Sequence, residues 1–170
     1  VPVLISLDAT IVLVGPEGAR EIALDDYYRA DGIAHTTAKP GEVTTELRVP
    51  LPTGPRRTRY VKWSVRKSID FPLLSVALRF DLADDATDAA GSAIMAVKVV
   101  AGVLGSRPRT VSKLDEVVGK KFGDPAVARI VSDATFAQCK PLENVPFEAP
   151  YRREMLRVYT RRAIEALARG

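Results

Sequence analysis

The chain has 170 residues, 46% of them hydrophobic, and a formal net charge of +4. This length fits one domain, or a small domain with part of a neighbour, and the apolar content is sufficient for a packed core. No apolar run approaches the roughly 20 residues that a membrane-spanning helix requires. One cysteine and one histidine exclude an internal disulfide and a metal site of ordinary ligand count.

The first residues read Val-Pro-Val-Leu-Ile, without Met, a basic segment or a cleavage site. They therefore lack the pattern of a signal peptide. We interpret this start as the middle of a strand, and the chain as an excised piece of a longer protein. Cys139 is expected to be a buried packing residue, as free cysteines usually are, and a reducing, cytoplasmic compartment is consistent with it.

A β-hairpin is predicted next. Residues 9–14 are rich in β-branched side chains, residues 15–18 contain the Gly-Pro pair of a turn, and residues 19–23 return as the second strand. Residues 24–28 fit one short helical turn, and Asp31-Gly32 opens a loop.

A second turn and strand precede a candidate linker. The Lys-Pro-Gly-Glu sequence at residues 39–42 is a strong turn signal. It leads into residues 43–49, where alternating apolar and polar side chains predict a half-buried strand. Three prolines and a glycine within residues 50–55 end regular structure. We place a boundary there, giving parts 1–55 and 56–170.

The second part predicts a small antiparallel sheet followed by helices. Residues 60–68 alternate in polarity, and residues 73–80 and 93–103 are nearly continuous apolar strands. An acidic, Ala-rich loop at residues 81–91 joins the last two, so the three strands form a meander.

The helical region begins after residue 109. Ser112 is predicted to cap a short helix, and Asp124 with Pro125 opens a second. A third helix is predicted from about residue 150 to residue 169, with an apolar face and an Arg-rich face. A small sheet with helices gathered on one side is an α+β fold.

Familiar catalytic and binding motifs are incomplete in this chain. Gly119-Lys120-Lys121 lacks the other residues of a phosphate loop. The glycines at 102 and 105 lack the rest of a dinucleotide-binding fingerprint. Asp81, Asp84, Asp85 and Asp88 lack the glycine and final Glu of a calcium loop. A single histidine, His35, leaves few options for a catalytic triad. The residues alone therefore indicate a mixed fold that is part of something larger.

Three segments, in order and spacing, resemble one family: residues 31–50 (DGIAHTTAKPGEVTTELRVP), residues 60–77 (YVKWSVRKSIDFPLLSVA) and residues 151–156 (YRREML). They are similar to the flavin-binding subunits of the xanthine dehydrogenase and carbon monoxide dehydrogenase family of molybdenum hydroxylases. The first segment and the Ile-Asp-Phe-Pro sequence at 69–72 lean toward the 4-hydroxybenzoyl-CoA reductase branch.

The resemblance implies an architecture and a role. Residues 1–55 would be a hairpin and strand ending the second lobe of the FAD-binding domain. Residues 56–170 would be the family's C-terminal domain, a three-stranded antiparallel sheet packed on a three-helix bundle. The subunit would carry electrons between FAD and iron–sulfur centres on a small partner subunit, which relay to molybdopterin on a large subunit. The glycine-rich loops for the FAD pyrophosphate are absent from this chain, so we expect no activity from it alone.

The resemblance also implies residues near the flavin. Lys62 aligns where the family places a lysine near the ring, and Val43 and Thr44 align with a backbone stretch that flanks it. A surface lysine and an ordinary strand are the alternatives for these positions. Trp63 is expected to be a core or subunit-contact aromatic residue, and His35 a loop residue that forms hydrogen bonds.

A different class of function stays open. The basic balance and the Arg-rich last helix also fit a stand-alone interaction domain that binds nucleic acid or an acidic protein. Acidic residues are nearly as numerous as basic ones, 21 against 25, which favours a solvated or subunit-facing helix instead.

Overall fold

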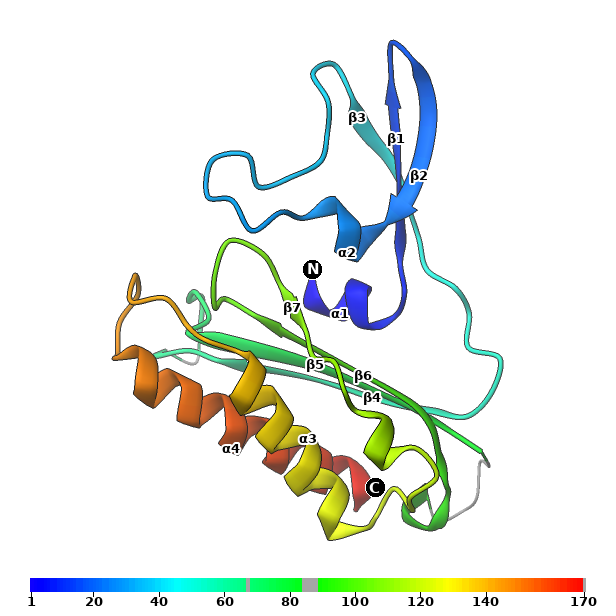
Figure 1. The fold of residues 1–170 in the computed structure, drawn as a ribbon, viewed down its shortest axis with the longest axis vertical. Helices are drawn as coiled ribbons and strands as arrows, with labels where there is room; N and C mark the ends of the chain where they lie inside the picture. The colour runs from blue at the N-terminus through cyan, green and yellow to red at the C-terminus, as the bar shows by residue number, and fades with distance from the viewer. Residues whose placement is uncertain (67, 84–88, 170) are drawn as a thin grey trace.

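The computed structural model describes residues 1–66, 68–83 and 89–169. Its larger sheet contains, side by side and antiparallel, β4 (Arg56–Trp63), β5 (Leu74–Leu82), β6 (Ile94–Gly102) and β7 (Arg109–Thr110). The predicted meander is confirmed, and the two-residue β7 adds a fourth strand. In Figure 1 this sheet is the middle layer of the molecule.

The first strand of this sheet lies earlier in the sequence than predicted. Arg56 and Arg57 pair with Asp81 and Phe80, so the strand extends back to the last residues of the candidate linker. It ends at Trp63, and the described residues of the segment 64–72 then form a loop in which the Asp70 carboxylate accepts hydrogen bonds from the N–H groups of Arg66 and Phe71. Residue 67 of the predicted strand lies outside the described residues, as do residues 84–88 of the predicted acidic loop.

Two long helices cover one face of the sheet: α3 (Pro125–Gln138) and α4 (Ala149–Ala168) (Figure 1). Asp124 caps α3, its side chain accepting a 2.8 Å hydrogen bond from Ala126 N, and Pro125 occupies the first turn as predicted. The side chains of β5 that face these helices are fully or almost fully buried: Leu74, Val76, Leu78, Phe80 and Leu82. The main core therefore lies between the sheet and the two helices.

The first of the three predicted helices, the short one after Ser112, is much shorter than the other two. It is one 3-10 turn, η2 (Asp115–Val117), and another such turn, η1 (Ala89–Gly91), precedes β6. Ser112 does not cap it: its N–H and hydroxyl donate to Gln138 Oε1 at 2.9 and 3.0 Å. The α+β fold is confirmed, but the helical layer consists of two helices and a single turn.

The first third of the chain forms a separate three-stranded sheet in the order β2-β1-β3. Its elements are β1 (Thr10–Gly15), β2 (Gly18–Ala23), α2 (Leu24–Tyr27) and β3 (Val43–Arg48). The predicted hairpin is confirmed to within a residue at each end. The prediction that β3 is half-buried is wrong, because β3 is an edge strand and all six of its residues are exposed.

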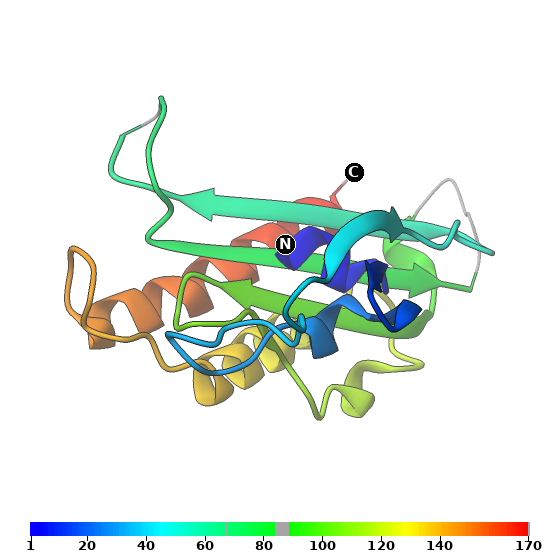
Figure 2. The ribbon, with the colours of Figure 1, turned by 90° about the horizontal axis from the view of Figure 1, so that it is seen from above.

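The chain starts with a helix, α1 (Pro2–Ser6), and not in mid-strand as predicted. Proline suits the first helical turn, where its fixed φ is helical and its missing N–H has no partner to lose. α1 lies on the face of the larger sheet opposite α3 and α4, as Figures 1 and 2 show. Gly102 permits this contact, since a Cβ there would lie only 2.8 Å from Pro2 Cγ.

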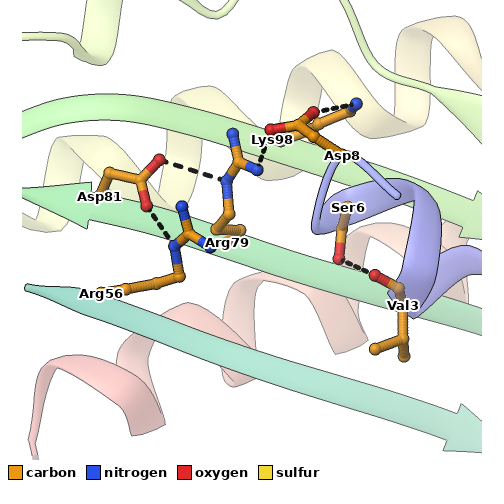
Figure 3. Close-up of polar contacts among 7 residues, drawn as sticks. All are labelled: Val3, Ser6, Asp8, Arg56, Arg79, Asp81 and Lys98. Carbon is orange, nitrogen blue, oxygen red and sulfur yellow. Dashed lines mark hydrogen bonds and ion pairs between the residues drawn. The ribbon is translucent and has the colours of Figure 1, made fainter. Parts of the chain in front are cut away.

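A cluster of charges fastens the first segment to the larger sheet (Figure 3). Asp8, which follows α1, forms ion pairs with Arg79 and with Lys98, the latter at 2.7 Å. Arg79 also lies 3.2 Å from Asp81, and Asp81 is paired at 2.5 Å with Arg56. The cluster joins β4, β5 and β6 to the turn between α1 and β1, so this turn is held to the larger sheet by charge.

Candidate functional site

The Lys-Pro-Gly-Glu turn is held by the side chain of its last residue. The Glu42 carboxylate accepts hydrogen bonds from Arg20 Nε and Nη2 at 2.7 and 2.8 Å, and from the Lys39 backbone N–H at 2.6 Å. Arg20 also donates to the Thr37 carbonyl at 2.8 Å. Gly41 has φ +82°, a conformation that favours glycine. The turn therefore fixes the point at which β3 begins.

The charge of Glu42 is strongly favoured in this setting. Hydrogen bonds from Arg20 and from the Lys39 N–H lower the pKa of Glu42 to about 2. A depressed carboxylate pKa contributes stability above the ordinary value of 4.5, which is lost as the pH falls toward the folded-state value. The Glu42 carboxylate is therefore ionised at neutral pH and keeps its hydrogen bonds to the turn.

Val43 and Thr44, predicted to flank a flavin ring, are the first two residues of β3. They pair with Val14 and Leu13 of β1, and both are exposed. Because β3 is an edge strand, no strand of the described residues lies beside the backbone N–H and C=O groups on its outer side. The structure thus presents an accessible backbone stretch at these two positions.

Lys62 lies near the end of β4, opposite Ser75 of β5. Residues directly opposite in an antiparallel pair share a face of the sheet, and Ser75 lies on the α1 side, so Lys62 does as well. Its side chain is exposed, and its ammonium donates a 2.6 Å hydrogen bond to the Asp70 carbonyl. Lys62 is therefore an accessible cation held against the loop of residues 64–72.

That loop is held by hydrogen bonds at its base and within it. Leu73 N donates to the Trp63 carbonyl at 2.7 Å. Within the loop, the Asp70 carboxylate accepts from the N–H groups of Arg66 and Phe71 at 2.8 and 2.9 Å. The backbone hydrogen bond from Arg66 lowers the pKa of Asp70. The position of the Lys62 ammonium therefore depends on the shape of this loop.

The three predicted site residues lie on two different sheets. Within the described part of the chain, no hydrogen bond or ion pair joins Lys62 to Val43 or Thr44. Trp63 is a core aromatic residue: it packs against Phe147, Tyr151 and Tyr159, with ring centroids 5.5–6.0 Å apart. His35 is exposed, and its carbonyl accepts a 2.9 Å hydrogen bond from Arg29 N.

One residue of the motifs was missed by the sequence reasoning. Arg152 is completely buried, with 0% of its surface exposed, and its guanidinium donates to backbone carbonyls of three separate loops. Burial lowers its pKa. The helical spacing contained a signal, because Arg152 precedes the buried Leu156 by four residues and Thr160 by eight, on the same face of α4.

The other arginines of α4 are the residues on which the alternative function, binding of nucleic acid or of an acidic protein, depends. Most of them are engaged within the molecule: Arg153 with the carbonyls of Phe136 and Ala137, Arg157 with Glu154 and Asp133, and Arg161 with Glu165. Arg157 and Arg161 thus have carboxylate partners within the molecule, and Arg153 has carbonyl acceptors. The basic helix is therefore better explained by intramolecular pairing.

Neither a metal site nor a membrane-spanning helix is found among the described residues. Cys139 is buried, as predicted, and desolvation raises its pKa to about 11, so the thiol stays protonated and inert at neutral pH. Over residues 1–66, 68–83 and 89–169, no group of three or more His, Cys, Asp or Glu side chains is placed to hold a metal ion. None of the helices described is long and apolar enough to cross a membrane.

Comparison with known proteins gives several matches over nearly the whole chain. The glyceraldehyde dehydrogenase medium chain of Sulfolobus acidocaldarius is 32% identical over 167 residues, covering 98% of this chain and 55% of that protein. The carbon monoxide dehydrogenase medium chain of Afipia carboxidovorans is 30% identical, covering 94% and 52%. This chain thus spans about half the length of the curated relatives it matches.

Solved structures agree in fold. A Cu,Mo-CO dehydrogenase matches with a TM-score of 0.81 and 28% identity, over 99% of this chain and 56% of that one. Quinoline 2-oxidoreductase from Pseudomonas putida 86 matches with a TM-score of 0.80 and 22% identity, over 99% and 55%, which is a likeness of fold alone. The family model of the CO dehydrogenase flavoprotein C-terminal domain matches residues 59–167. The chain therefore belongs to the CO dehydrogenase flavoprotein family.

Proposed function

We propose that this chain is the C-terminal half of the FAD-binding subunit of a molybdenum hydroxylase. The observation that carries the proposal is the match of residues 59–167 to the flavoprotein C-terminal domain of CO dehydrogenase. The names of the relatives, medium chains of glyceraldehyde and carbon monoxide dehydrogenases, add that the subunit works beside others. FAD, when bound, supplies the electron transfer, and substrate chemistry belongs to another subunit.

The partners follow from the same proposal. A small subunit would carry [2Fe-2S] clusters and a large subunit would carry molybdopterin, because one cysteine in this chain is too few for a cluster. A cytoplasmic location is proposed with them. In this arrangement the chain's own task is to hold the flavin ring and set its potential.

Two features of the structure support flavin contacts by this chain. Lys62 is an accessible ammonium on the α1 side of the larger sheet, and Val43 and Thr44 offer an exposed edge of backbone. A cation or a backbone N–H beside the ring favours the negatively charged form of the cofactor, and so raises its potential. We propose that Lys62 has this role and that Val43 and Thr44 flank the ring.

Replacement of Lys62 by Met in the full-length subunit tests this assignment. The side-chain volume is nearly kept and the charge is lost, so the flavin potential should fall. A partly solvated interaction is worth about 1–2 kcal/mol at an effective dielectric of about 20, which is on the order of 20–45 mV for a two-electron couple. The measurement is a redox titration of the bound flavin.

Arg59→Met is the matched control, because Arg59 is an exposed cation of the same strand whose cross-strand partner, Leu78, faces α3 and α4. It should leave the potential unchanged. An unaltered potential in Lys62→Met, with FAD content intact, would return Lys62 to the class of ordinary surface lysines.

Two structural units are part of the proposal, with the boundary at residues 55 and 56. The separation into two sheets, and the absence of any helix or strand between Arg48 and Arg56 in the structure, support it. Limited proteolysis should cut first within residues 49–55 or in the first third of the chain. First cuts inside α4 would argue against the boundary.

The finer assignment is a 4-hydroxybenzoyl-CoA reductase-like complex. Its support is the resemblance of residues 31–50 and of Ile69-Asp70-Phe71-Pro72 to that branch. Assays of the complete complex with 4-hydroxybenzoyl-CoA, glyceraldehyde and carbon monoxide would decide among the substrates. Turnover of either of the last two, without the first, would remove the branch assignment and leave the subunit assignment in place.

A further inference from the structure

Arg152 is a buried cation without a carboxylate partner among the described residues. Its Nε and Nη2 donate to the Leu73 carbonyl at 3.0 and 2.8 Å, Nη1 to Leu142 at 2.8 Å, and Nη2 to Val103 at 2.7 Å. Burying a charge is costly unless its hydrogen-bonding groups are satisfied. Here the dipoles of three carbonyls provide that compensation, and the planar fork of arginine suits them.

The three carbonyls come from three loops at one end of the larger sheet. Leu73 ends the loop between β4 and β5, Val103 follows β6, and Leu142 lies between α3 and α4. α4 begins at this end of the sheet (Figure 1). Val103 has φ +66°, a strained conformation for a β-branched residue, and its carbonyl is one of those that Arg152 holds. Strain of this kind persists only where surrounding contacts enforce it.

A continuous set of bonds leads from Arg152 to Lys62. The Leu73 carbonyl is held by Arg152, while the N–H of the same residue donates to Trp63 at 2.7 Å. Those two bonds fix the base of the loop of residues 64–72. That loop supplies the Asp70 carbonyl, the hydrogen-bond acceptor for Lys62. The Arg152 guanidinium is thus connected, through Leu73 and this loop, to the acceptor of the Lys62 ammonium.

We propose that Arg152 is a positioning residue for Lys62, and through it a determinant of the flavin potential. The inference rests on the proposed flavin function of Lys62. It differs from a purely structural role of Arg152 in one respect. Replacing a purely structural residue changes only the stability of the protein. Replacing a positioning residue also changes the potential of a cofactor that the residue does not touch.

The test compares Arg152→Lys with Arg153→Lys in the full-length subunit. A lysine ammonium is compact and lacks the planar fork by which the separate nitrogens of arginine meet the carbonyls of the three loops. Arg153 is the adjacent residue of the same helix and also donates to carbonyls, those of Phe136 and Ala137, but these lie at the end of α3. Arg152→Lys should lower the flavin potential in the same direction as Lys62→Met, with FAD retained, and Arg153→Lys should leave it unchanged.

A double-mutant cycle separates the possible outcomes. If Arg152 acts through Lys62, the potential of Arg152→Lys with Lys62→Met should be no lower than that of Lys62→Met alone. Additive shifts, or an unchanged potential in Arg152→Lys when Lys62→Met does shift it, would overturn the inference and spare the proposed function. An unchanged flavin potential in Lys62→Met itself would remove both the proposed role of Lys62 and the inference about Arg152.

A further variant covers the case in which Arg152→Lys does not fold. Asp70→Ala removes the carboxylate that accepts from the N–H groups of Arg66 and Phe71, and so should loosen the same loop while the buried guanidinium is kept. Loss of an anion would by itself raise the flavin potential, so a fall can come only from displacement of Lys62. A fall is expected, and an unchanged or raised potential contradicts the inference.

In the 170-residue chain, tryptic cleavage after Arg66 should be several-fold faster in Arg152→Lys than in Arg153→Lys, and equal rates would oppose the inference.

Discussion

Phe80→Ala is expected to lower the free energy of unfolding of the 170-residue chain by about 3–5 kcal/mol, the usual cost of removing a buried phenyl ring. Phe80 has 0% of its surface exposed and lies at the centre of the core between β5 and the helices. Its ring centroid is 4.8 Å from that of Phe122, so the substitution also removes an aromatic contact. Urea unfolding followed by circular dichroism measures the change.

Met95→Ala is the matched control for that experiment. Met95 lies on β6 of the same sheet, but 60% of its surface is exposed, and the cost should stay below about 0.5 kcal/mol. Similar losses in the two variants would show that the sheet face at Phe80 is not the core described above.

Asp8→Asn is expected to lower the free energy of unfolding by about 1–3 kcal/mol. Removing one partner of a fully buried ion pair costs about 3–5 kcal/mol, and the half-exposed side chain of Asp8 reduces this figure through solvent screening. Arg79, which is 9% exposed, loses one of the two carboxylates that pair with it among the described residues. Asp8 has φ +57°, which Asn tolerates well, so the substitution tests the charge and not the backbone.

The effect should depend on pH with a definite sign. Partial burial alone would raise the pKa of Asp8, but the hydrogen bonds and charges of Lys98 and Arg79 outweigh it and hold the pKa below its ordinary value of 3.8. The native protein therefore keeps its advantage over Asp8→Asn above pH 3.8 and loses it as the pH falls through the lower folded-state value. Glu46→Gln, which removes an exposed surface pair with Arg48, should cost under about 1 kcal/mol. An Asp8→Asn deficit that stays constant down to low pH would contradict the account.

Elements with strong local signals could be predicted from the sequence. The Asp124-Pro125 start of α3 is a combination of cap and first-turn proline that few other structures accommodate. The turn residues around Gly15 and Gly41 and the β-branched strands beside them located the hairpin and β3. These features depend on neighbours in the sequence, and the structure agrees with them closely.

Features that depend on distant contacts were predicted less well. Val1–Ile5 is apolar and β-branched, which favours a strand, yet packing of Ile5 and Pro2 on the larger sheet selects a helix. β3 alternates in polarity, as a half-buried strand does. Its burial depends on whether another element packs on it, and among the described residues none buries it. Ser112 resembles a cap, while its actual partner, Gln138, lies 26 residues away.

The candidate site shows the same division. The family resemblance points to Lys62, Val43 and Thr44 as residues near the flavin. In the structure Lys62 is exposed on β4, and Val43 and Thr44 are exposed on β3. The sequence assigns Arg152 no role of its own among the arginines of the last helix. Only the tertiary structure shows three loops whose carbonyls converge on it.

The flavin content of the full-length subunit tests the central claim most directly. Purified from its own cells, the subunit should carry stoichiometric FAD with the visible absorbance of a flavin. The 170-residue chain alone should be colourless and bind FAD weakly, because most of the affinity for a dinucleotide comes from backbone amides that hold its pyrophosphate, and it lacks those glycine-rich loops. A full-length protein without FAD, binding duplex DNA with a steep salt dependence, would contradict the flavin assignment and favour the interaction-domain alternative.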